Sequence, residues 1–345
     1  MARRFKVGFI GCGSAVQVFH IPGYKNTAGV DLTAACDPGK KQREAVRRMC
    51  EGIRVYPDYK RMLAAEQLDM ISVASPNRFH AEHALAALAH GAHVLLEKPP
   101  VLEMKDCRRI REAVAGGDRQ LIVGFTQRHT PAYGRVRRLL EEGAIGEPYM
   151  VRIRFAHRGP YPGWAQSPWF YDPHRAGGGA LLDMGIHAID LALWLLGPVR
   201  SVQAMVRTLR KKIDVEDNAV LLLEFERSRT LGYIEAGWTS PAGFRGIEIM
   251  GDRGCVVVEP EKGLRLTTGD TSPDVSRRSP MRTRLLMKGP ITDGWAHEIP
   301  TVVRALRRGE DLGSGIDAGA AALSVALAGY RSSRTGRSVD VAIVR

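Results

Sequence analysis

Short apolar runs alternate with amphipathic stretches along the first 125 residues of the chain. The runs have the length of strands, whereas the stretches between them repeat apolar positions every three or four residues, as helices do. The predicted strands are Phe5–Ile10, Val30–Cys36, Met70–Ala74, His93–Leu96 and Leu121–Phe125. The predicted helices are Ala15–Asn26, Lys40–Cys50, Tyr59–Ala65, His80–His90 and Glu103–Ala115. This alternation predicts parallel βαβ units in a doubly wound α/β sheet, where ligands bind beyond the carboxyl ends of the strands.

From residue 126 the pattern changes. A predicted helix, a strand, a loop rich in aromatic residues, Gly and Pro, and a second helix cover Ala132–Glu142, Tyr149–Phe155, His157–Gly179 and Ala180–Leu196. Further strands are predicted at Val199–Val206, Asn218–Phe225, Thr230–Trp238, Gly246–Met250, Cys255–Val258 and Leu264–Thr268. Strands joined by short turns predict an α+β domain with an open, mainly antiparallel sheet covered by helices on one face.

The end of the chain is expected to contain a long loop, two helices and a last strand. These are Asp270–Asp293, Ala296–Arg308, Ala318–Ser333 and a strand near Val339–Ile343. A length of 345 residues suits two domains. We place the first domain at 1–125 and the second at 126–345, and leave open that the C-terminal segment packs back on the first domain.

The composition is that of a soluble globular protein, with 44% apolar and 25% charged residues. The net charge of +13 raises the question of nucleic acid binding. However, residues 1–125 contribute +6 (19 basic, 13 acidic) and the remainder +7 (31 basic, 24 acidic), so the excess is spread along both parts. The densest basic clusters, Arg207–Lys212 and Arg277–Arg284, are far apart and have few aromatic neighbours. A solvated basic surface that attracts acidic or phosphorylated ligands is favoured over a nucleic-acid groove.

The cysteines indicate a reducing compartment. Their number is odd, and no two have a CxxC or metal-ligand spacing, which favours reduced, mostly buried thiols. The apolar run Val7–Ile10 is too short for a signal peptide, and no segment approaches the ~18 apolar residues that cross a bilayer. We therefore expect a cytoplasmic protein with no membrane partner.

A glycine-containing turn follows the first predicted strand and opens the first predicted helix, with the sequence Gly11-Cys12-Gly13-Ser14-Ala15-Val16. Gly11 permits a tight turn, Gly13 lets the backbone approach a pyrophosphate, and the helix N-terminus offers N–H groups to phosphate oxygens. Val16 stands at the third glycine position of the usual fingerprint, which serves helix–strand packing. The pattern predicts a phosphate-binding turn.

An acidic residue at the end of the second predicted strand supports this interpretation. Asp37 lies 24 residues after Gly13. A carboxylate there accepts hydrogen bonds from both adenosine ribose hydroxyls and repels a 2′-phosphate, which favours NAD over NADP. Lys40 and Lys41 partly offset that repulsion, so NADP stays open. The alternative is that Asp37 only caps a helix.

Two further motifs follow predicted strands. Ser75-Pro76 forces an extended bend, and Asn77 and His80 come near the next helix start, as caps or as ligand contacts. In Glu97-Lys98-Pro99-Pro100 a rigid proline places a lysine at the carboxyl end of a buried strand. A partly desolvated lysine there suits proton transfer or polarisation of a carbonyl group.

The second domain contains three glycines at a predicted helix start, followed by Asp183 and His187. The glycines are expected to let a substrate approach the backbone. Asp183 and His187 are four residues apart and share a helix face, so the carboxylate can orient the imidazole as a general base. Such pairs are also common as simple structural hydrogen bonds. We expect no metal, because no third ligand stands at a useful spacing.

Together these motifs resemble the glucose–fructose oxidoreductase/inositol dehydrogenase (Gfo/Idh/MocA) family along the whole chain. The resemblance rests on Gly11-x-Gly13, Asp37, Ser75-Pro76-Asn77-x-x-His80, Glu97-Lys98-Pro99, Val123-Gly124-Phe125-Thr126-Gln127-Arg128, and Gly177-Gly178-Gly179-x-x-x-Asp183-x-x-x-His187. It implies an N-terminal Rossmann domain and a C-terminal α/β domain whose open sheet forms a homodimer or homotetramer. The departures are Val16 and Gln127, the latter where relatives often carry arginine.

The resemblance also implies the site residues. The catalytic set would be Lys98, Asp183 and His187, with Glu97-Lys98-Pro99 beside the nicotinamide. The residues assigned to the cofactor are Gly11, Gly13, Ser14, Ala15, Val16, Asp37, Ser75, Pro76, Asn77, His80, Glu97, Lys98 and Gln127. The candidates for the substrate are Arg128, His157, Trp164, Trp169 and Tyr171, together with Arg158 and His174 in the same loop. The aromatic residues suit the C–H faces of a sugar ring, or else they pack a domain interface.

The predicted function is an NAD-dependent oxidoreductase acting on a secondary hydroxyl, or its ketone, of a polyol, sugar or sugar derivative. His187 would take the hydroxyl proton while hydride passes to the nicotinamide, Lys98 would stabilise the same oxygen, and Asp183 would orient the base. One alternative is redox-neutral sugar chemistry, an eliminating glycosidase or an epimerase that recycles a bound NAD. Another is a non-catalytic regulator that binds NAD or nucleic acid, which the intact set of three residues disfavours.

Overall fold

The computed structural model describes residues 3–226, 230–269 and 280–342. Contacts between residues divide the chain into two compact units. The first consists of Met1–Phe125, Pro160–Gly177 and Trp295–Leu323, and the second of Thr126–Gly159, Gly178–Gly294 and Ser324–Arg345. Two segments that the sequence places in the second domain, 160–177 and 295–323, therefore belong with the first unit.

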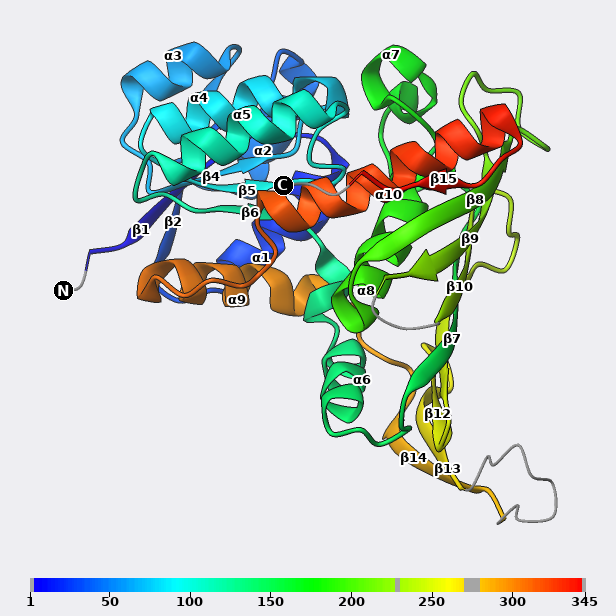
Figure 1. Cartoon of the computed structure of the whole chain (residues 1–345). Coiled ribbons are helices and arrows are strands. Elements are labelled where there is room, and N and C mark those ends of the chain that lie inside the picture. The colour runs from blue at the N-terminus through cyan, green and yellow to red at the C-terminus, as the bar shows by residue number, and fades with distance from the viewer. Residues whose placement is uncertain (1–2, 227–229, 270–279, 343–345) are drawn as a thin grey trace. The chain divides into compact units, whose positions relative to one another are not determined.

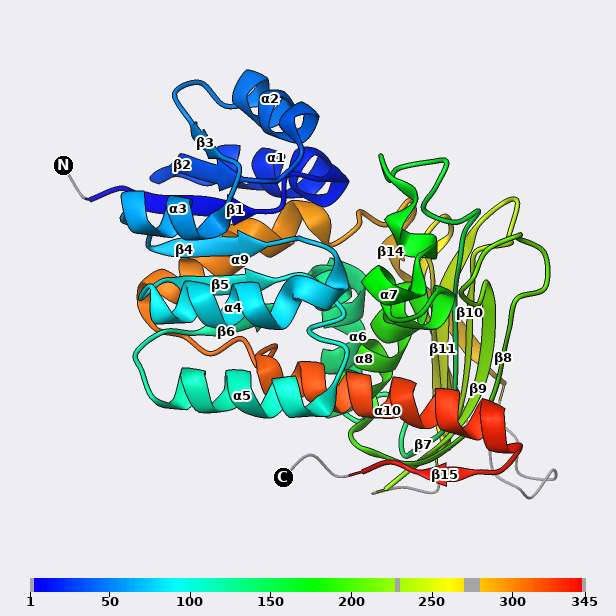
Figure 2. The same ribbon diagram turned by 90° about the horizontal axis from the view of Figure 1, so that it is seen from above.

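The first unit contains a six-stranded parallel sheet in the order β3-β2-β1-β4-β5-β6, which Figure 2 shows side by side. The strands are β1 (Phe5–Ile10), β2 (Val30–Cys36), β3 (Arg54–Tyr56), β4 (Met70–Val73), β5 (His93–Leu96) and β6 (Leu121–Val123). The helices are η1 (Val16–His20), α1 (Ile21–Lys25), α2 (Lys40–Met49), α3 (Tyr59–Ala65), η2 (Asn77–Phe79), α4 (His80–Ala89), α5 (Met104–Ala115), η4 (Pro168–Tyr171), α7 (Pro173–Ala176) and α9 (Trp295–Arg308). α1 and α9 lie on one face of the sheet, and α4 and α5 on the other (Figure 1). The predicted doubly wound sheet is confirmed.

Strand β3 was not predicted from the sequence. It is three residues long, lies at the edge of the sheet, and has one exposed and two half-buried residues. It therefore has neither an apolar run nor the length that periodicity needs. The predicted loop 157–179 likewise contains two short helices, η4 and α7. Each has a proline in its first turn, where proline favours the start of a helix.

The core of the first unit explains why the strand ends are fixed. All four residues of β4 and of β5 are buried, as expected for strands covered on both faces. Val16 is fully buried in the same cluster as Phe9 and Tyr24. The cysteines are free thiols, four of them buried, and burial raises the pKa of Cys107 to about 11. A buried, protonated thiol of this kind is chemically inert.

The second unit contains a nine-stranded sheet in the order β14-β13-β12-β11-β7-β10-β9-β8-β15. Its strands are β7 (Pro148–Ala156), β8 (Val199–Arg207), β9 (Asn218–Phe225), β10 (Leu231–Gly237), β11 (Phe244–Gly251), β12 (Gly254–Glu259), β13 (Gly263–Thr268), β14 (Arg282–Lys288) and β15 (Val339–Asp340). Among the described strands of this sheet, only β7 and β10 pair in parallel, so the expected mainly antiparallel sheet is confirmed.

One face of this sheet is covered by helices. The helices of the second unit are η3 (Thr126–His129), α6 (Pro131–Glu141), η5 (Leu181–Gly185) and α8 (Ile186–Leu196), and α10 (Ile316–Thr335) enters it from residue 324 onward. α8 packs on β7 and β10, and α6 on β12 (Figure 1). Ser332 and Ser333 of α10 accept hydrogen bonds from the N–H groups of Ala204 and Val206 at 2.9 Å, which fixes α10 along β8.

The end of the chain differs in part from the prediction. The stretch Asp270–Asp293 was expected to be a loop, but residues 282–288 form β14, which pairs with β13. Its exposed residues do not alternate, so periodicity could not reveal it. Residues 270–279 of that stretch, and residue 343 of the expected strand near Val339–Ile343, lie outside the described residues.

The basic cluster Arg207–Lys212 is folded around a carboxylate. The N–H groups of Leu209, Arg210 and Lys211 donate to Asp217 at 2.7–2.9 Å. Burial of Asp217 opposes its ionisation, but these donors outweigh that effect and lower its pKa. The backbone of this cluster is therefore set by an internal acidic residue. The second cluster, Arg277–Arg284, lies partly outside the described residues.

One helical run is apolar enough to cross a membrane by length and composition. It covers Pro173–Leu196, and 72% of its most apolar window is buried within the structure. This corrects the expectation that no segment reaches that length. The same test is passed by core helices of globular domains, and the burial fits a core helix.

The glycines before η5 are required by packing. A Cβ atom on Gly178 would overlap the Tyr330 hydroxyl, and one on Gly179 would overlap the carbonyl oxygen of Glu216. The Ala180 N–H donates to that same carbonyl at 2.9 Å, so the Glu216 backbone cannot easily move away. The expectation that these glycines open the backbone to substrate is corrected at both positions, because protein atoms already occupy the space.

We therefore predict that Gly179→Ala destabilises the protein by about 2 kcal/mol or more, because overpacking against backbone forces a shift of the main chain. The measurement is urea unfolding. Gly134→Ala is the matched control, since Gly134 lies within α6 and a Cβ there has no atom within 4 Å beyond the adjacent helix backbone. The control should be neutral or stabilising by up to about 1 kcal/mol. Equal stability of G179A and wild type would contradict the packing role.

Candidate active site

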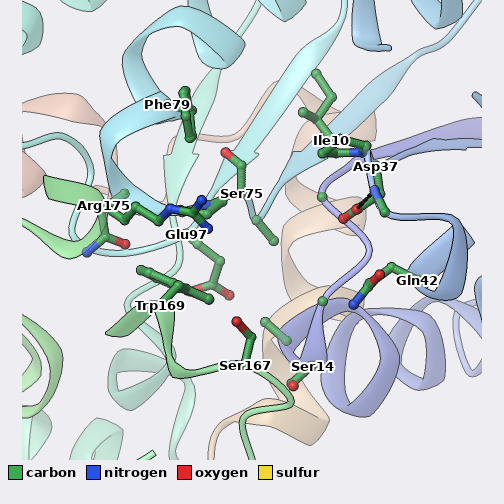
Figure 3. Close-up of a pocket in the computed structure, with 18 of the residues that line it drawn as sticks. Ile10, Ser14, Asp37, Gln42, Ser75, Phe79, Glu97, Ser167, Trp169 and Arg175 are labelled. Carbon is green, nitrogen blue, oxygen red and sulfur yellow. Dashed lines mark hydrogen bonds between the residues drawn. The ribbon is translucent and has the colours of Figure 1, made fainter. Parts of the chain in front are cut away.

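The first unit contains a cavity of about 590 Å³ at the carboxyl ends of β1, β2, β4 and β5. All its lining residues belong to the first unit, as Met1–Phe125 or as residues 164–175. Figure 3 shows Asp37 and Gln42 at one end of the cavity and Glu97, Trp169 and Arg175 at the other. Parallel strands end together at one sheet edge, which is where doubly wound folds bind ligands.

The turn after β1 has the geometry of a phosphate-binding turn. Gly11 has φ +93°, and a Cβ there would lie 2.6 Å from the carbonyl oxygen of Ala74, so only glycine fits. A Cβ on Gly13 would have no protein atom within 4 Å, which leaves open space above the turn. Ser14 and Ala15 line the cavity next to it. Val16 does not, which corrects its assignment to the cofactor: it packs the helix onto the strands, as its position in the fingerprint requires.

Asp37 is bonded to this turn. Its Oδ2 accepts a hydrogen bond from the Cys12 N–H at 2.9 Å, and its Oδ1 accepts one from the Gly39 N–H at 2.8 Å. The Arg43 guanidinium donates to the carbonyl oxygens of Asp37 and Pro38 at 2.6 and 2.9 Å. The carboxylate is thus fixed at the cavity wall, with acceptor capacity left for ribose hydroxyls. The turn, the open space at Gly13 and this carboxylate fit a dinucleotide such as NAD.

The loop after β4 connects to the segment that carries Lys98. The ring nitrogens of His80 lie 2.8 Å from the carbonyl oxygens of Pro99 and Ser75. Burial lowers the pKa of His80, and the two carbonyl groups act in the opposite direction. His80 therefore joins the two loops and positions the residue before Pro99, which is Lys98.

Glu97, the residue before Lys98, has a buried partner in η1. Its Oε1 lies 2.8 Å from Nε2 of His20, the last residue of η1, and its Oε2 accepts a hydrogen bond from the Lys98 N–H at 3.2 Å. Glu97 and Lys98 both line the cavity. The backbone of the Glu97-Lys98-Pro99 motif is thus held by His20 and His80, so that the lysine is placed by buried neighbours.

Three cavity residues outside the predicted set form a ring cluster. His83 Nδ1 lies 2.8 Å from Ser75 Oγ, its ring contacts Tyr59 edge-on at 4.7 Å between centroids, and it stacks on Phe79 at 5.9 Å. Burial lowers the pKa of His83 to about 4. The neutral imidazole and the two aromatic rings offer flat apolar surfaces on which a nucleobase can stack. Their helical positions gave no sequence signal, since His83 lies one turn beyond the motif that ends at His80.

Residues 160–177 form a segment that we call the strap. Trp164 and Trp169, which the sequence suggests as substrate contacts, line the cavity, and Gln166, Ser167, Phe170 and Arg175 line it without having been predicted. The rings of Trp169 and Phe170 stack at 3.9 Å between centroids. Tyr171 does not line the cavity, since its hydroxyl donates to the carbonyl oxygen of Tyr161. His174 is exposed, and its N–H donates to the Asp172 side chain at 2.8 Å.

In the second unit Asp183 lies in η5 and His187 at the start of α8, and both side chains are buried. Single π-helical turns such as η5 are frequent at functional sites. Trp238 was not predicted, and its Nε1–H donates to Asp183 Oδ2 at 2.8 Å. His157 Nε2 lies 3.7 Å from the same oxygen. Because the Gly159 N–H donates to His157 Nδ1 at 2.8 Å, a neutral His157 carries its proton on Nε2, facing Asp183.

The remaining predicted residues of the second unit lie elsewhere. Arg128 makes a bidentate ion pair with Asp190 at 2.6 and 2.9 Å, and both side chains are at least nine-tenths buried. This pair holds η3 onto α8, so the structure gives Arg128 a packing role where a substrate contact was expected. Gln127 is buried and does not line the cavity of the first unit. The guanidinium of Arg158 donates to the carbonyl oxygen of Pro241 at 2.7 Å.

A doubly wound unit with this turn, carboxylate and lysine is a dinucleotide-binding domain of the oxidoreductase type. Comparison with known families agrees. Residues 5–125 match the model of an oxidoreductase family with an NAD-binding Rossmann fold, and residues 133–257 match the GFO/IDH/MocA C-terminal domain. The chain belongs to the Gfo/Idh/MocA family of oxidoreductases.

Two curated proteins and one solved structure illustrate what the chain is similar to. Inositol 2-dehydrogenase 2 of Saccharopolyspora erythraea is 30% identical over 98% of this chain and 95% of its own length. D-glucoside 3-dehydrogenase of Escherichia coli is 34% identical over 201 residues, which are 58% of this chain and 56% of that protein. The crystal structure of GenD2 from gentamicin A biosynthesis in complex with NAD is 28% identical, with a TM-score of 0.84 over 99% of this chain and 97% of GenD2.

We predict a pH effect from His83. The unfolded chain takes up a proton at this histidine near pH 6.5, and the folded chain only near pH 4. Between these two pH values the chain therefore takes up a proton when it unfolds. The free energy of unfolding consequently falls as the pH is lowered from about 6.5 to about 4. His83→Gln should reduce the loss of stability between neutral pH and about pH 5 by about 2 kcal/mol. Urea unfolding at the two pH values measures the difference.

The slope against pH is the readout for His83, because the substitution also removes the hydrogen bond to Ser75 and shifts stability at neutral pH. His174→Gln, at an exposed histidine of the same unit, is the control and should keep the wild-type slope. An H83Q variant with the wild-type slope would show that burial of His83 does not govern its protonation.

Proposed function

We propose that the protein oxidises a secondary hydroxyl group of a sugar, polyol or sugar derivative, or reduces the matching ketone, with NAD. The observation that carries the proposal is that Lys98, the phosphate turn and Asp37 line one cavity. Relatives named as inositol and glucoside dehydrogenases support the substrate class. The aromatic residues of the strap that line the cavity, Trp164 and Trp169, suit the C–H faces of a sugar ring.

The residues that would hold NAD are those of the cavity. The turn Gly11–Ala15 receives the phosphates with its backbone N–H groups, and Asp37 accepts the hydroxyls of the adenosine ribose. The strand end at Glu97 and Lys98 is the place for the nicotinamide. When bound, NAD supplies an acceptor for the hydride that leaves the substrate carbon.

Lys98, Asp183 and His187 form the proposed catalytic set. Lys98 Nζ donates a hydrogen bond to the substrate oxygen and stabilises negative charge on it. The His187 imidazole accepts the hydroxyl proton. Asp183 is held by Trp238 and faces the Nε2 of His157, so its carboxylate has a fixed direction from which to support the base.

A panel of inositols, sugars, sugar acids and nucleotide sugars, each offered with NAD and with NADP, tests the function. Net oxidation is expected to accumulate NADH with one class of substrate. Conversion of a sugar without NADH accumulation would identify the redox-neutral alternative. No conversion of any member, with NAD bound, would contradict both and leave the non-catalytic regulator.

Lys98→Ala should lower kcat by roughly 10²- to 10⁴-fold while NAD affinity stays within about twofold, because the ammonium stabilises charge on the reacting oxygen. The rate is measured with the substrate found in the panel and NAD affinity by calorimetry. Lys105→Ala, at an exposed lysine paired with Glu103 on α5, is the matched control and should keep the wild-type rate. Turnover of K98A at the wild-type rate would contradict the proposed catalytic role of Lys98.

We propose further that the open face of the nine-stranded sheet joins two copies of the chain. Met205, Val220, Leu222 and Leu231 are exposed on this face, and their strand registers place them on one side of β8, β9 and β10. Ion pairs between Arg152 and Glu248 and between Arg154 and Glu235, at 3.0 and 2.9 Å, connect β7 with β11 and with β10. An apolar patch bordered by charges of both signs suits a second copy of itself.

The mass in solution, from light scattering after size exclusion, tests this assembly. The wild type should be a dimer or a tetramer. Leu222→Glu places a charge in the patch, where the side chain is 53% exposed, and should lower the assembly state. Leu209→Glu, in the loop after β8 with 65% exposure, is the control and should not. A monomeric wild type would contradict the proposal.

A further inference from the structure

The strap is tied to the phosphate turn by two hydrogen bonds of one residue. The Gln166 N–H donates to Ser14 Oγ at 2.9 Å, and Gln166 Nε2 donates to Gln17 Oε1 at 3.0 Å. Gln17 is itself anchored, because its Nε2 donates to the Cys12 carbonyl oxygen at 2.7 Å. A continuous chain of hydrogen bonds thus runs from the strap to the turn.

The other end of the strap is tied to the loop after β4. Asn77 Nδ2 donates to the carbonyl oxygen of Ala176 at 2.8 Å, and both residues are buried. The strap is therefore fixed at two places on the sheet edge that binds the dinucleotide. Between these attachments it lines the same cavity as the turn and Asp37, and Figure 3 shows Ser167 beside Ser14 there.

Ser14 couples the strap to whatever the turn holds. Its hydroxyl oxygen already accepts the Gln166 N–H, so the hydroxyl proton stays available for another acceptor. A phosphate group offers acceptors only. A hydroxyl that donates to an anion becomes a better acceptor, which strengthens its bond to the strap. The strap and a bound pyrophosphate therefore stabilise each other.

We propose that the strap is a second binding element for the dinucleotide, a clasp whose tethers slow cofactor release. The proposal rests on NAD occupying this cavity, and it does not depend on the substrate or on the catalytic set. To leave, the cofactor must separate the strap from the turn, so the bonds of Gln166 contribute to the barrier for release. Breaking one tether should therefore raise the release rate more than it disturbs the fold.

The test follows NADH release by stopped flow. The protein is loaded with NADH, mixed with excess NAD, and the decay of NADH fluorescence gives the dissociation rate constant. Gln17→Ala removes the tether at a residue outside the cavity lining, and Gln166→Ala removes it at the strap. Each should raise the rate about fivefold, the kinetic equivalent of one net hydrogen bond.

The double variant Q17A/Q166A shows whether the two side chains act through the hydrogen bond between them or each through its own separate contacts. If the two side chains act through their mutual bond, the double variant releases NADH no faster than the faster single variant. If they act independently, the two effects multiply, and the tether is contradicted. Gln120→Ala, a glutamine away from the cavity, is the matched control and should release NADH at the wild-type rate.

Wild-type release rates in both Q17A and Q166A would overturn the clasp. Should Q17A fail to fold, Q166A decides, because its side chain is exposed on the strap. The outcome is distinct from a failure of the proposed function: a protein that binds NADH with unclasped kinetics remains a dehydrogenase candidate. A wild type that does not bind NADH would contradict the proposed cofactor site as well.

Discussion

The hydrogen bond from the Cys12 N–H to the Asp37 carboxylate joins the two halves of the cofactor site. It connects the turn after β1 to the end of the neighbouring strand β2, and it works only because parallel strands place both ends at one sheet edge. Gly11 is fixed by the same constraint, since its backbone passes against Ala74 after β4. The proposed positions for phosphate and ribose therefore follow from the register of three adjacent strands.

Buried histidines extend this frame to the Glu97-Lys98-Pro99 segment at the end of β5. His20 holds Glu97, and His80 connects the loop after β4 to Pro99. Neither His20 nor His80 is proposed to transfer a proton, although histidine is the usual residue for that role. Their contribution is to fix the backbone around Lys98, which sets the point from which its side chain extends. Trp238 does the same for Asp183 in the second unit.

The sequence was most informative where a motif and a strand end coincide. The apolar runs that become β1, β2 and β5 were located to the residue, and Gly11, Asp37 and Lys98 could be placed relative to them. Sequence patterns failed where geometry depends on distant residues. The strap follows no period, yet Gln166 reaches Ser14 across more than a hundred positions of the chain. β3 and β14 are short or exposed, so they show no clear periodicity. The need for glycine at position 179 comes from the carbonyl oxygen of Glu216, to which no local sequence pattern connects it.

The fixed carboxylate of Asp37 makes the proposed cofactor site one for NAD. Calorimetric titration of the wild-type protein with NAD and with NADP, in the same buffer, tests it most directly. We expect NAD to bind roughly tenfold tighter or more than NADP, because a 2′-phosphate would be placed against a carboxylate already bonded to the turn. NADP binding as tightly as NAD, or tighter, would contradict it.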